Sequence, residues 1–140
     1  MWRGSHERAV YHWIDHTGEL ELEVRARDEA EIFEHALAAV HELLDDGNRD
    51  FGEVSHQLEL SGTDRATLLA DYLAELFFLG ETQGFVPDRL ERLELRDREL
   101  SATVRGRRGR PPHLVKAVTY HELAFDRSAE GWRACMVLDV

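Results

Sequence analysis

The sequence predicts an α+β fold, with a mostly antiparallel sheet and two helices packed against it. Segments of alternating apolar and polar residues, typical of strands with one buried face, outnumber the segments with helical spacing. Their order is strand, strand, helix, strand, helix and then four strands. Too few strands alternate with helices to build a doubly wound parallel sheet, so an antiparallel arrangement is favoured.

The first helix is predicted between two strand-like segments and a glycine. Residues 10–14 are apolar and aromatic, and residues 19–26 begin with glutamates that alternate with leucine and valine; both segments are expected to be strands. Asp28 is a suitable N-cap, and Glu31 stands three residues later, close to the pattern of a capping box. Apolar residues at helical spacing follow, and Gly47 is expected to end the helix.

The second helix is expected to be more apolar than the first. Residues 54–60 alternate again and predict the strand before it, and residues 61–64 predict a turn that offers a cap. Apolar side chains at helical spacing follow. Gly80 and Gly84 are expected to close the helix, with Pro87 in the loop beyond it.

The remainder of the chain is expected to be strands and loops. Residues 90–95 and 100–104 predict a hairpin, and the arginine, glycine and proline residues of 105–112 predict a loop. Residues 114–125 and 132–140 predict two long strands joined by a turn.

Composition favours one globular domain over residues 1–140, with residues 1–8 as a flexible N-terminal segment. The chain has 140 residues, of which 43% are hydrophobic. Its single cysteine, Cys135, cannot form an internal disulfide, so we expect a reducing, cytoplasmic location. Cys135 lies in a strand pattern and is expected to be a small buried residue rather than a nucleophile. No apolar run is long enough to cross a membrane.

The charge of the chain is strongly acidic. The formal net charge is −11, which repels free nucleic acid unless a basic patch stands out. The basic stretch at residues 105–110 holds four arginines, and the rest of the chain is more acidic still. This balance favours a divalent cation or a basic protein as a ligand, although a solvated surface explains net charge alone more simply.

Standard catalytic motifs are absent from the sequence, and carboxylates are the most informative candidates. There is no glycine-rich phosphate loop after a strand, no Gly-x-Ser-x-Gly, no Cys-x-x-Cys and no His-Glu-x-x-His. Asp15 and Glu19 flank a glycine-containing bend, and Asp139 follows an apolar run. Mg²⁺ and Ca²⁺ prefer carboxylate and carbonyl oxygens, which a strand end supplies, whereas zinc prefers a cluster of cysteine and histidine. A capped strand end or a single salt bridge remains the simpler explanation of these acids.

Several segments together resemble the archease family. His16-Thr17-Gly18-Glu19, preceded by Asp15, resembles the family's His-Thr-Ala-Asp signature. Val-Lys-Ala-Val-Thr-Tyr-His at residues 115–121 resembles its Ile-Lys-Ala-Val-Thr-Tyr-His strand. Residues 28–36 and 68–76 are similar to its two helices, and residues 132–140 to its closing strand. The resemblance spans about residue 10 to the C-terminus and implies an archease-like fold.

The resemblance also implies a function. Archeases are small cytosolic accessory proteins of RtcB-type RNA ligases, which join RNA ends in tRNA splicing and RNA repair with GTP and metal ions. They promote guanylylation of the ligase's active-site histidine, allow the ligase to turn over and broaden its nucleotide use. The chain is therefore expected to be an activator of an RNA ligase rather than an enzyme. It would meet RNA and GTP only through that ligase, and it would not bind a membrane.

The family's metal ligands correspond to Glu19, Asp139 and the backbone oxygen of Val140. The resemblance implies that these residues bind a divalent cation, either Ca²⁺ or Mg²⁺/Mn²⁺. The chain departs from the family pattern because Gly18 replaces alanine and Glu19 replaces aspartate. Glutamate keeps the charge but is one methylene longer, and the freedom of a glycine backbone is suited to absorb that extra reach.

Four further residues are candidates for functional or partner contacts: Asp15, His16, Lys116 and His121. Lys116 is expected either to contact a phosphate or an acidic group of the ligase or to face solvent, whereas His16 and His121 are expected to orient the bend and the final hairpin. Two other functions remain open. One is a metal-independent, chaperone-like adaptor, and the other is a metal-dependent phosphohydrolase that uses Asp15, His16 and Glu19, although a fuller catalytic set is lacking.

Overall fold

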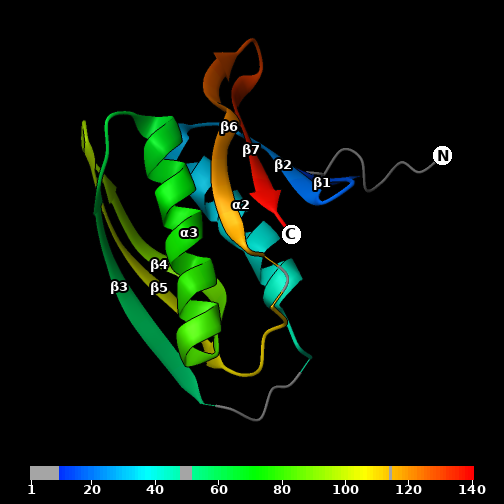
Figure 1. The fold of residues 1–140 in the computed structure, drawn as a ribbon. Helices are drawn as coiled ribbons and strands as arrows, with labels where there is room; N and C mark the ends of the chain where they lie inside the picture. The colour runs from blue at the N-terminus through cyan, green and yellow to red at the C-terminus, as the bar shows by residue number, and fades with distance from the viewer. Residues whose placement is uncertain (1–9, 48–51, 114) are drawn as a thin grey trace, which may run out of the picture.

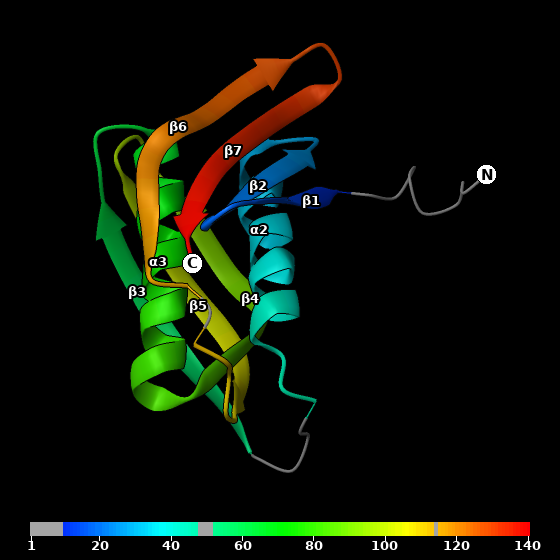
Figure 2. The same cartoon turned by 45° about the vertical axis from the view of Figure 1, so that its right-hand side comes forward.

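Two separate antiparallel sheets hold the strands, and each of the two helices contacts strands of both sheets (Figures 1 and 2). The computed structural model describes residues 10–47, 52–113 and 115–140. Sheet A has the strand order β1 (Tyr11–His16), β2 (Glu19–Ala26), β7 (Gly131–Asp139) and β6 (Ala117–Ser128). Sheet B has the order β3 (Glu53–Ser61), β5 (Glu99–Arg108) and β4 (Phe85–Leu95). The helices are α2 (Glu29–Leu44) and α3 (Arg65–Gln83).

The α+β class is confirmed, but the single sheet that we expected is divided in two. Figure 2 shows α2 and α3 lying between the two layers of strands. Because α3 has neighbours on more than one side, it buries residues around most of its circumference, including Leu69, Tyr72 and Phe77. Tyr72 stacks edge-on against Phe33 of α2, with ring centroids 5.3 Å apart. The core therefore lies along the two helices.

Helix boundaries follow local hydrogen bonds. Asp28 caps α2 by accepting a hydrogen bond from the backbone N–H of Glu31, at 2.9 Å. Asp64 does the same for α3 through the N–H of Thr67, and these bonds hold the pKa of Asp64 below its usual value. Both predicted caps are confirmed. The prediction that Gly47 ends α2 is wrong, since the helix ends at Leu44.

The cap of α2 makes the stability of the protein depend on pH. Hydrogen bonds from the Arg27 side chain and backbone N–H lower the pKa of Glu31 from 4.5 to about 2. Because the folded-state pKa is depressed, this contribution is full above about pH 4.5 and is lost as the pH falls towards 2. We expect Glu31→Gln to make the fall in melting temperature over this range shallower than in the unmutated protein, as thermal unfolding at each pH would show. Equal slopes for the two proteins would contradict this.

Several predicted loop segments are strands or helix. Gly80 lies inside α3, which continues to Gln83 before Gly84 caps it with a φ of 66°. The prediction of a loop at Pro87 is wrong, because this residue lies in β4, an edge strand of sheet B, at a register irregularity. Proline is tolerated at edges and irregular positions because its missing N–H does not interrupt a central ladder. β6 begins at Ala117 rather than at residue 114, which lies outside the described residues, as does the predicted N-terminal segment 1–8.

The arginine-rich stretch is mainly part of the central strand of sheet B, which contradicts the predicted loop. β5 continues to Arg108 and pairs with both β3 and β4. Arg107 is largely buried and forms ion pairs with Asp45 and Asp46 beyond the end of α2. Arg105 pairs with Glu91 and Glu53. At least these two arginines therefore hold the fold together.

Within the ranges that the structure describes, no helix is both long and apolar enough to span a membrane.

Candidate functional site

The predicted acids Glu19 and Asp139 stand opposite each other at one end of sheet A. They are Cα partners in the antiparallel pairing of β2 with β7. Just beyond this pair, where β2 begins and β7 ends, the N–H of Val140 donates a hydrogen bond of 3.2 Å to the carbonyl of Gly18. This bond makes Glu19 and Asp139 a non-hydrogen-bonded pair, the arrangement in which opposed side chains stand closest, with Cβ atoms about 4.5–5.5 Å apart. β2 lies near the start of the described chain and β7 at its end, and their pairing places Glu19 opposite Asp139 (Figure 1).

Glu19 differs from the other glutamates of β2 in its partners. Glu19, Glu21 and Glu23 share one face of the sheet because side chains alternate along a strand. Glu21 lies 3.2 Å from Nε2 of His16, and Glu23 accepts a hydrogen bond of 2.5 Å from Nε of Arg133. Across residues 10–47, 52–113 and 115–140, no basic side chain forms an ion pair with Glu19 or with Asp139.

The pKa of Glu23 shows what a basic partner does for a carboxylate on this face of β2. Partial burial is the largest single influence on Glu23 and raises its pKa, but the hydrogen bond to Arg133 and the charges of Arg133 and Arg25 together outweigh it, so the pKa lies below its usual value. Like charges directly opposed on neighbouring strands are destabilising, and the Glu19 and Asp139 pair lacks the compensation that Glu23 receives. A cation between the two carboxylates would remove this repulsion.

The chemistry of the donors fits a hard cation. Two carboxylates, together with the backbone carbonyl of the adjoining residue Val140, would form an all-oxygen set of the kind that Ca²⁺ and Mg²⁺ prefer. In the part of the chain that the structure describes, no group of three or more His, Cys, Asp or Glu side chains is placed to hold a metal ion. A cation held by Glu19 and Asp139 therefore needs Val140 or water to complete its coordination.

Asp15 does not join this pair. The predicted strand of residues 10–14 extends to His16, so Asp15 belongs to β1 and pairs with Leu20. Alternation then directs Asp15 to the face of the hairpin opposite to Glu19. His16 does pair with Glu19 along the backbone, but its ring contacts Glu21. The chain reverses at Thr17 and Gly18, whose φ of 73° suits glycine.

Lys116 lies next to the pair formed by Glu19 and Asp139 (the acid pair), whereas His121 does not. The backbone N–H of Lys116 donates a hydrogen bond of 2.7 Å to the carbonyl of Asp139. His121 falls where the register of β6 against β7 is interrupted, and it contacts Glu122 at 3.1 Å. Glu122 has a φ of 54°, which marks the local distortion of this strand. The sequence predicted functional contacts for Lys116 and His121, but only Lys116 lies beside Glu19 and Asp139.

Cys135 is buried in β7, as expected, and burial raises the pKa of its thiol. A raised pKa leaves little thiolate near neutral pH, so Cys135 is poorly suited to nucleophilic chemistry.

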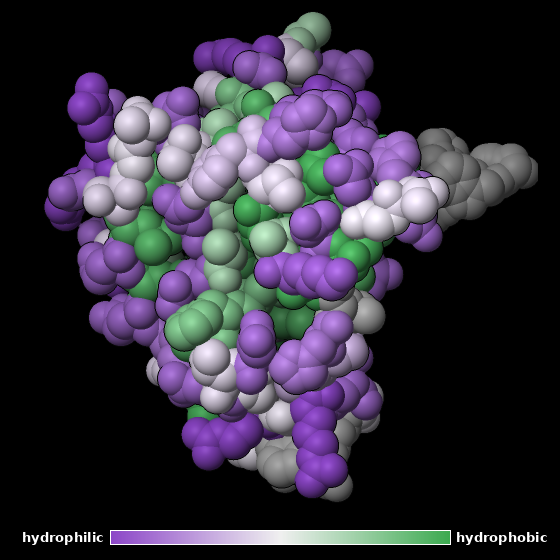
Figure 3. Space-filling view, viewed as in Figure 1, coloured by the Kyte–Doolittle hydropathy of each residue, from purple (hydrophilic) through white to green (hydrophobic). Residues whose placement is uncertain are grey.

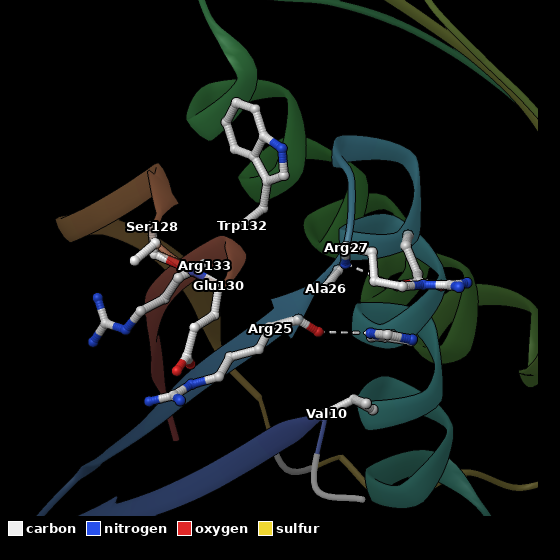
Figure 4. A pocket seen from close by; sticks show the side chains of 11 residues that line it. Val10, Arg25, Ala26, Arg27, Ser128, Glu130, Trp132 and Arg133 are labelled. Carbon is white, nitrogen blue, oxygen red and sulfur yellow. Dashed lines mark hydrogen bonds and ion pairs between the residues drawn. The ribbon is translucent and has the colours of Figure 1, made fainter.

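A cavity of about 580 Å³ that the sequence did not predict lies at the other end of β2 and β7 (Figure 4). Arg25 and Arg133, which are Cα partners, line it together with Arg27, His35 and Trp132. No sequence signal could have found it, since its walls come from three distant segments. All three of its arginines form ion pairs, Arg27 with Glu31 and both Arg25 and Arg133 with Glu23. None of the residues predicted as site residues lines this cavity.

Comparisons with known proteins agree on one family. A model of the Archease protein family (MTH1598/TM1083) matches residues 11–140. "Protein archease" of Methanosarcina barkeri is 29% identical over 145 residues, covering 97% of this chain and 99% of that protein. The solution structure of Methanobacterium thermoautotrophicum protein 1598 is similar with a TM-score of 0.71 and 25% identity, covering 94% of this chain and 99% of that one. A Thermotoga maritima crystal structure named "an archease, possible chaperone" has a TM-score of 0.63 and 25% identity, over 91% and 94%.

The fold thus defines a small α+β protein of the archease type. The chain belongs to the archease family, which confirms the resemblance noted in the sequence.

Proposed function

We propose that this protein is an accessory protein of an RtcB-type RNA ligase, acting in tRNA splicing or RNA repair. It promotes guanylylation of the ligase and its turnover, is able to broaden its nucleotide use, and has no catalytic activity of its own. Membership of the archease family supports this proposal. The observation that carries it is the close pairing of Glu19 with Asp139 without a basic partner among the described residues.

The residues at this strand end have distinct parts in the proposal. Glu19 and Asp139 hold a divalent cation, with Val140 supplying an oxygen beside them. When bound, the cation supplies positive charge to phosphate oxygens, at which charge develops during nucleotidyl transfer. Lys116, whose backbone N–H is bonded to the carbonyl of Asp139, adds an exposed basic residue beside the same pair. The strand end thus offers positive charge to a phosphate in the partner's active site.

The direct test is guanylylation of a cognate RtcB-type ligase with GTP, with and without this protein. Substoichiometric amounts are expected to accelerate formation of the guanylylated ligase, because an accessory protein acts repeatedly. No acceleration by the unmutated protein would overturn the proposal. RNA joining in the same assay would show whether turnover also depends on the protein.

Binding of the cation is tested separately on the isolated protein. We expect Glu19→Ala to weaken Ca²⁺ or Mn²⁺ binding about 10- to 100-fold, since one of two carboxylate ligands is lost. Glu19→Asp should bind at least as tightly as the unmutated protein, because the family pattern has aspartate there. Isothermal titration calorimetry measures both.

Glu21→Gln is the matched control for this titration. It removes a charge from the same face of β2, but from a residue that His16 already contacts. Its affinity for the cation should stay within about threefold of the unmutated value, since it loses only a longer-range attraction. Equal weakening by Glu21→Gln and Glu19→Ala would mean that the cation is held by general negative charge.

A metal-independent adaptor is the second candidate, and the "possible chaperone" name of the Thermotoga protein favours it. Binding and stimulation of the ligase that persist in a chelator would support this candidate over a cation-dependent accessory protein. A free-standing phosphohydrolase is disfavoured, because Asp15 and Glu19 project to opposite faces of the β1–β2 hairpin and cannot converge on one substrate.

A further inference from the structure

The end of β7 lies between two other strands at the acid pair. Asp139 pairs with Glu19 of β2 on one side and with the first residue of β6 on the other. Two backbone hydrogen bonds hold this end in place. The N–H of Val140 donates to the carbonyl of Gly18 at 3.2 Å, and the N–H of Lys116 donates to the carbonyl of Asp139 at 2.7 Å. The acid pair therefore lies between a bond to the β2 side and a bond to the β6 side.

Burial changes abruptly along β7 at this point. Residues 134–138 are buried, and Leu138 is completely so, whereas Asp139 is exposed and Val140 is only partly buried. Figure 3 shows apolar side chains over α3 and β6 within a largely hydrophilic surface. Separating residues 134–138 from the sheet would bring core side chains into contact with water, which separating Asp139 does not. A local opening of this strand is therefore expected to stop at Leu138.

Opposing forces act on the two residues beyond Leu138. Glu19 and Asp139 repel each other across the ladder, and in the ranges that the structure describes neither carboxylate has a basic partner. The backbone bonds of Val140 and Lys116 oppose this repulsion, but a bond at a solvent-exposed strand end opens easily. The balance between the closed and the open strand end is therefore sensitive to anything that changes the charge of the pair.

We propose that Asp139 and Val140 form a clasp that a divalent cation closes. Without a cation, repulsion within the acid pair separates these two residues transiently from β2 and β6. A cation held by Glu19 and Asp139 binds only the closed form, so it shifts the population towards that form. This inference rests on the proposed function, because it makes the concentration of cation a regulator of the same site.

The clasp also holds the start of β6. The connection from β5 is fixed at its β5 end by the N–H of Gly109, which donates to the carbonyl of Gly84 at 2.7 Å. At its β6 end it is fixed by the bond from Lys116, the only lysine of the chain, to Asp139. Opening of the clasp breaks the second bond and leaves the first intact. A partner therefore meets Lys116 in a fixed position only when the cation is bound.

Amide hydrogen exchange, followed by NMR in Ca²⁺ and in a chelator, tests the clasp on the isolated protein. With Ca²⁺ at about 100 times its dissociation constant, protection of the Val140 and Lys116 amides should rise by up to about 100-fold, because the open form does not hold the cation. The amides of Arg25, which is bonded to the carbonyl of Val10, and of Gly109 are internal references. Their protection should change far less, since their local opening leaves the cation bound.

Glu19→Gln separates the repulsion from the binding of the cation. It removes one charge of the pair, and residue 19 is distant in sequence from both reporter amides, so their intrinsic exchange rates are unchanged. In a chelator, the Val140 and Lys116 amides should be about two- to fivefold better protected than in the unmutated protein, because the opposed charges are gone. Addition of Ca²⁺ should then add little.

Glu21→Gln is the matched control for this variant. It removes a charge from the same face of β2, but from a residue that His16 contacts. Protection of the Val140 and Lys116 amides in a chelator should stay within about 1.5-fold of the unmutated value, since Glu21 is further from Asp139. Equal protection in Glu19→Gln and the unmutated protein would show that repulsion does not open the strand end, and would overturn the clasp.

The remaining outcomes separate the clasp from the proposed function. Binding of Ca²⁺ in calorimetry without any change at Val140 and Lys116 means a rigid site, which overturns the clasp whether or not the ligase is stimulated. No binding of Ca²⁺ also overturns it, and stimulation of a cognate ligase in a chelator would then leave a metal-independent accessory function. Cation-dependent protection in a protein that does not stimulate the ligase supports the clasp and overturns the function.

Discussion

Replacing Asp139 with alanine is expected to abolish stimulation of ligase guanylylation while leaving the protein folded. Asp139 is exposed, and it stands opposite Glu19 in a position where like charges repel. Its removal eliminates one of the two carboxylates proposed to hold the cation and at the same time relieves that repulsion. In a chelator, the melting temperature should therefore stay level or rise by about 1–4 °C.

When a cation is added, the unmutated protein should become more stable than Asp139→Ala. A cation that binds only the folded state would, at about 100 times its dissociation constant, stabilise the unmutated protein by about 2.7 kcal/mol. Asp139→Ala should show almost none of this gain. Asp139→Asn serves as a second variant of nearly the same shape, and retention of the cation-dependent rise in both variants would rule out Asp139 as a ligand.

Gly106→Ala is expected to be the most destabilising small substitution in sheet B. A Cβ at residue 106 would lie 2.1 Å from the carbonyl oxygen of Val86 and 2.9 Å from Cε1 of Phe85. Both contacts are far inside van der Waals separation, and the first is with backbone, which cannot rotate away. We expect a loss of about 3 kcal/mol in the free energy of unfolding, because β4 must shift from the central strand.

Urea denaturation measures this loss, with Gly52→Ala as the matched control. Nothing lies within 4 Å of a Cβ built at Gly52, so this variant should change stability by less than about 0.5 kcal/mol. Similar stabilities of the two variants would show that β4 and β5 tolerate a wider separation at Gly106.

Local structure was largely predictable, whereas strand pairing was not. The caps at Asp28 and Asp64 and most strand segments follow from residue type and periodicity, which act over a few positions. Alternation identifies a buried face but not the neighbouring strand, so the division into two sheets could not be foreseen. The loop predicted at residues 105–110 failed for the same reason, since Gly106 and Arg107 are explained by contacts with distant Val86 and Asp45.

The sequence predicted which residues form the candidate site, but only part of how they are arranged. The resemblance to archeases singled out Glu19 and Asp139, and their register in β2 and β7 places them opposite each other. The role of Asp15 was obscured because the predicted strand stopped at Ile14. Extending β1 by two residues moves Asp15 from a flexible bend to a fixed face of the hairpin.

Sheet A also bears on how the protein folds, because it joins β1 and β2, near the start of the sequence, to β6 and β7, near its end. Contacts of such large sequence separation close late and slow folding, because the chain must first lose the entropy of a long loop. During synthesis, β2 has only β1 as a partner until β7 has emerged from the ribosome. The acid pair therefore forms only after β7 has been made, so a half-made chain has Glu19 without its partner Asp139.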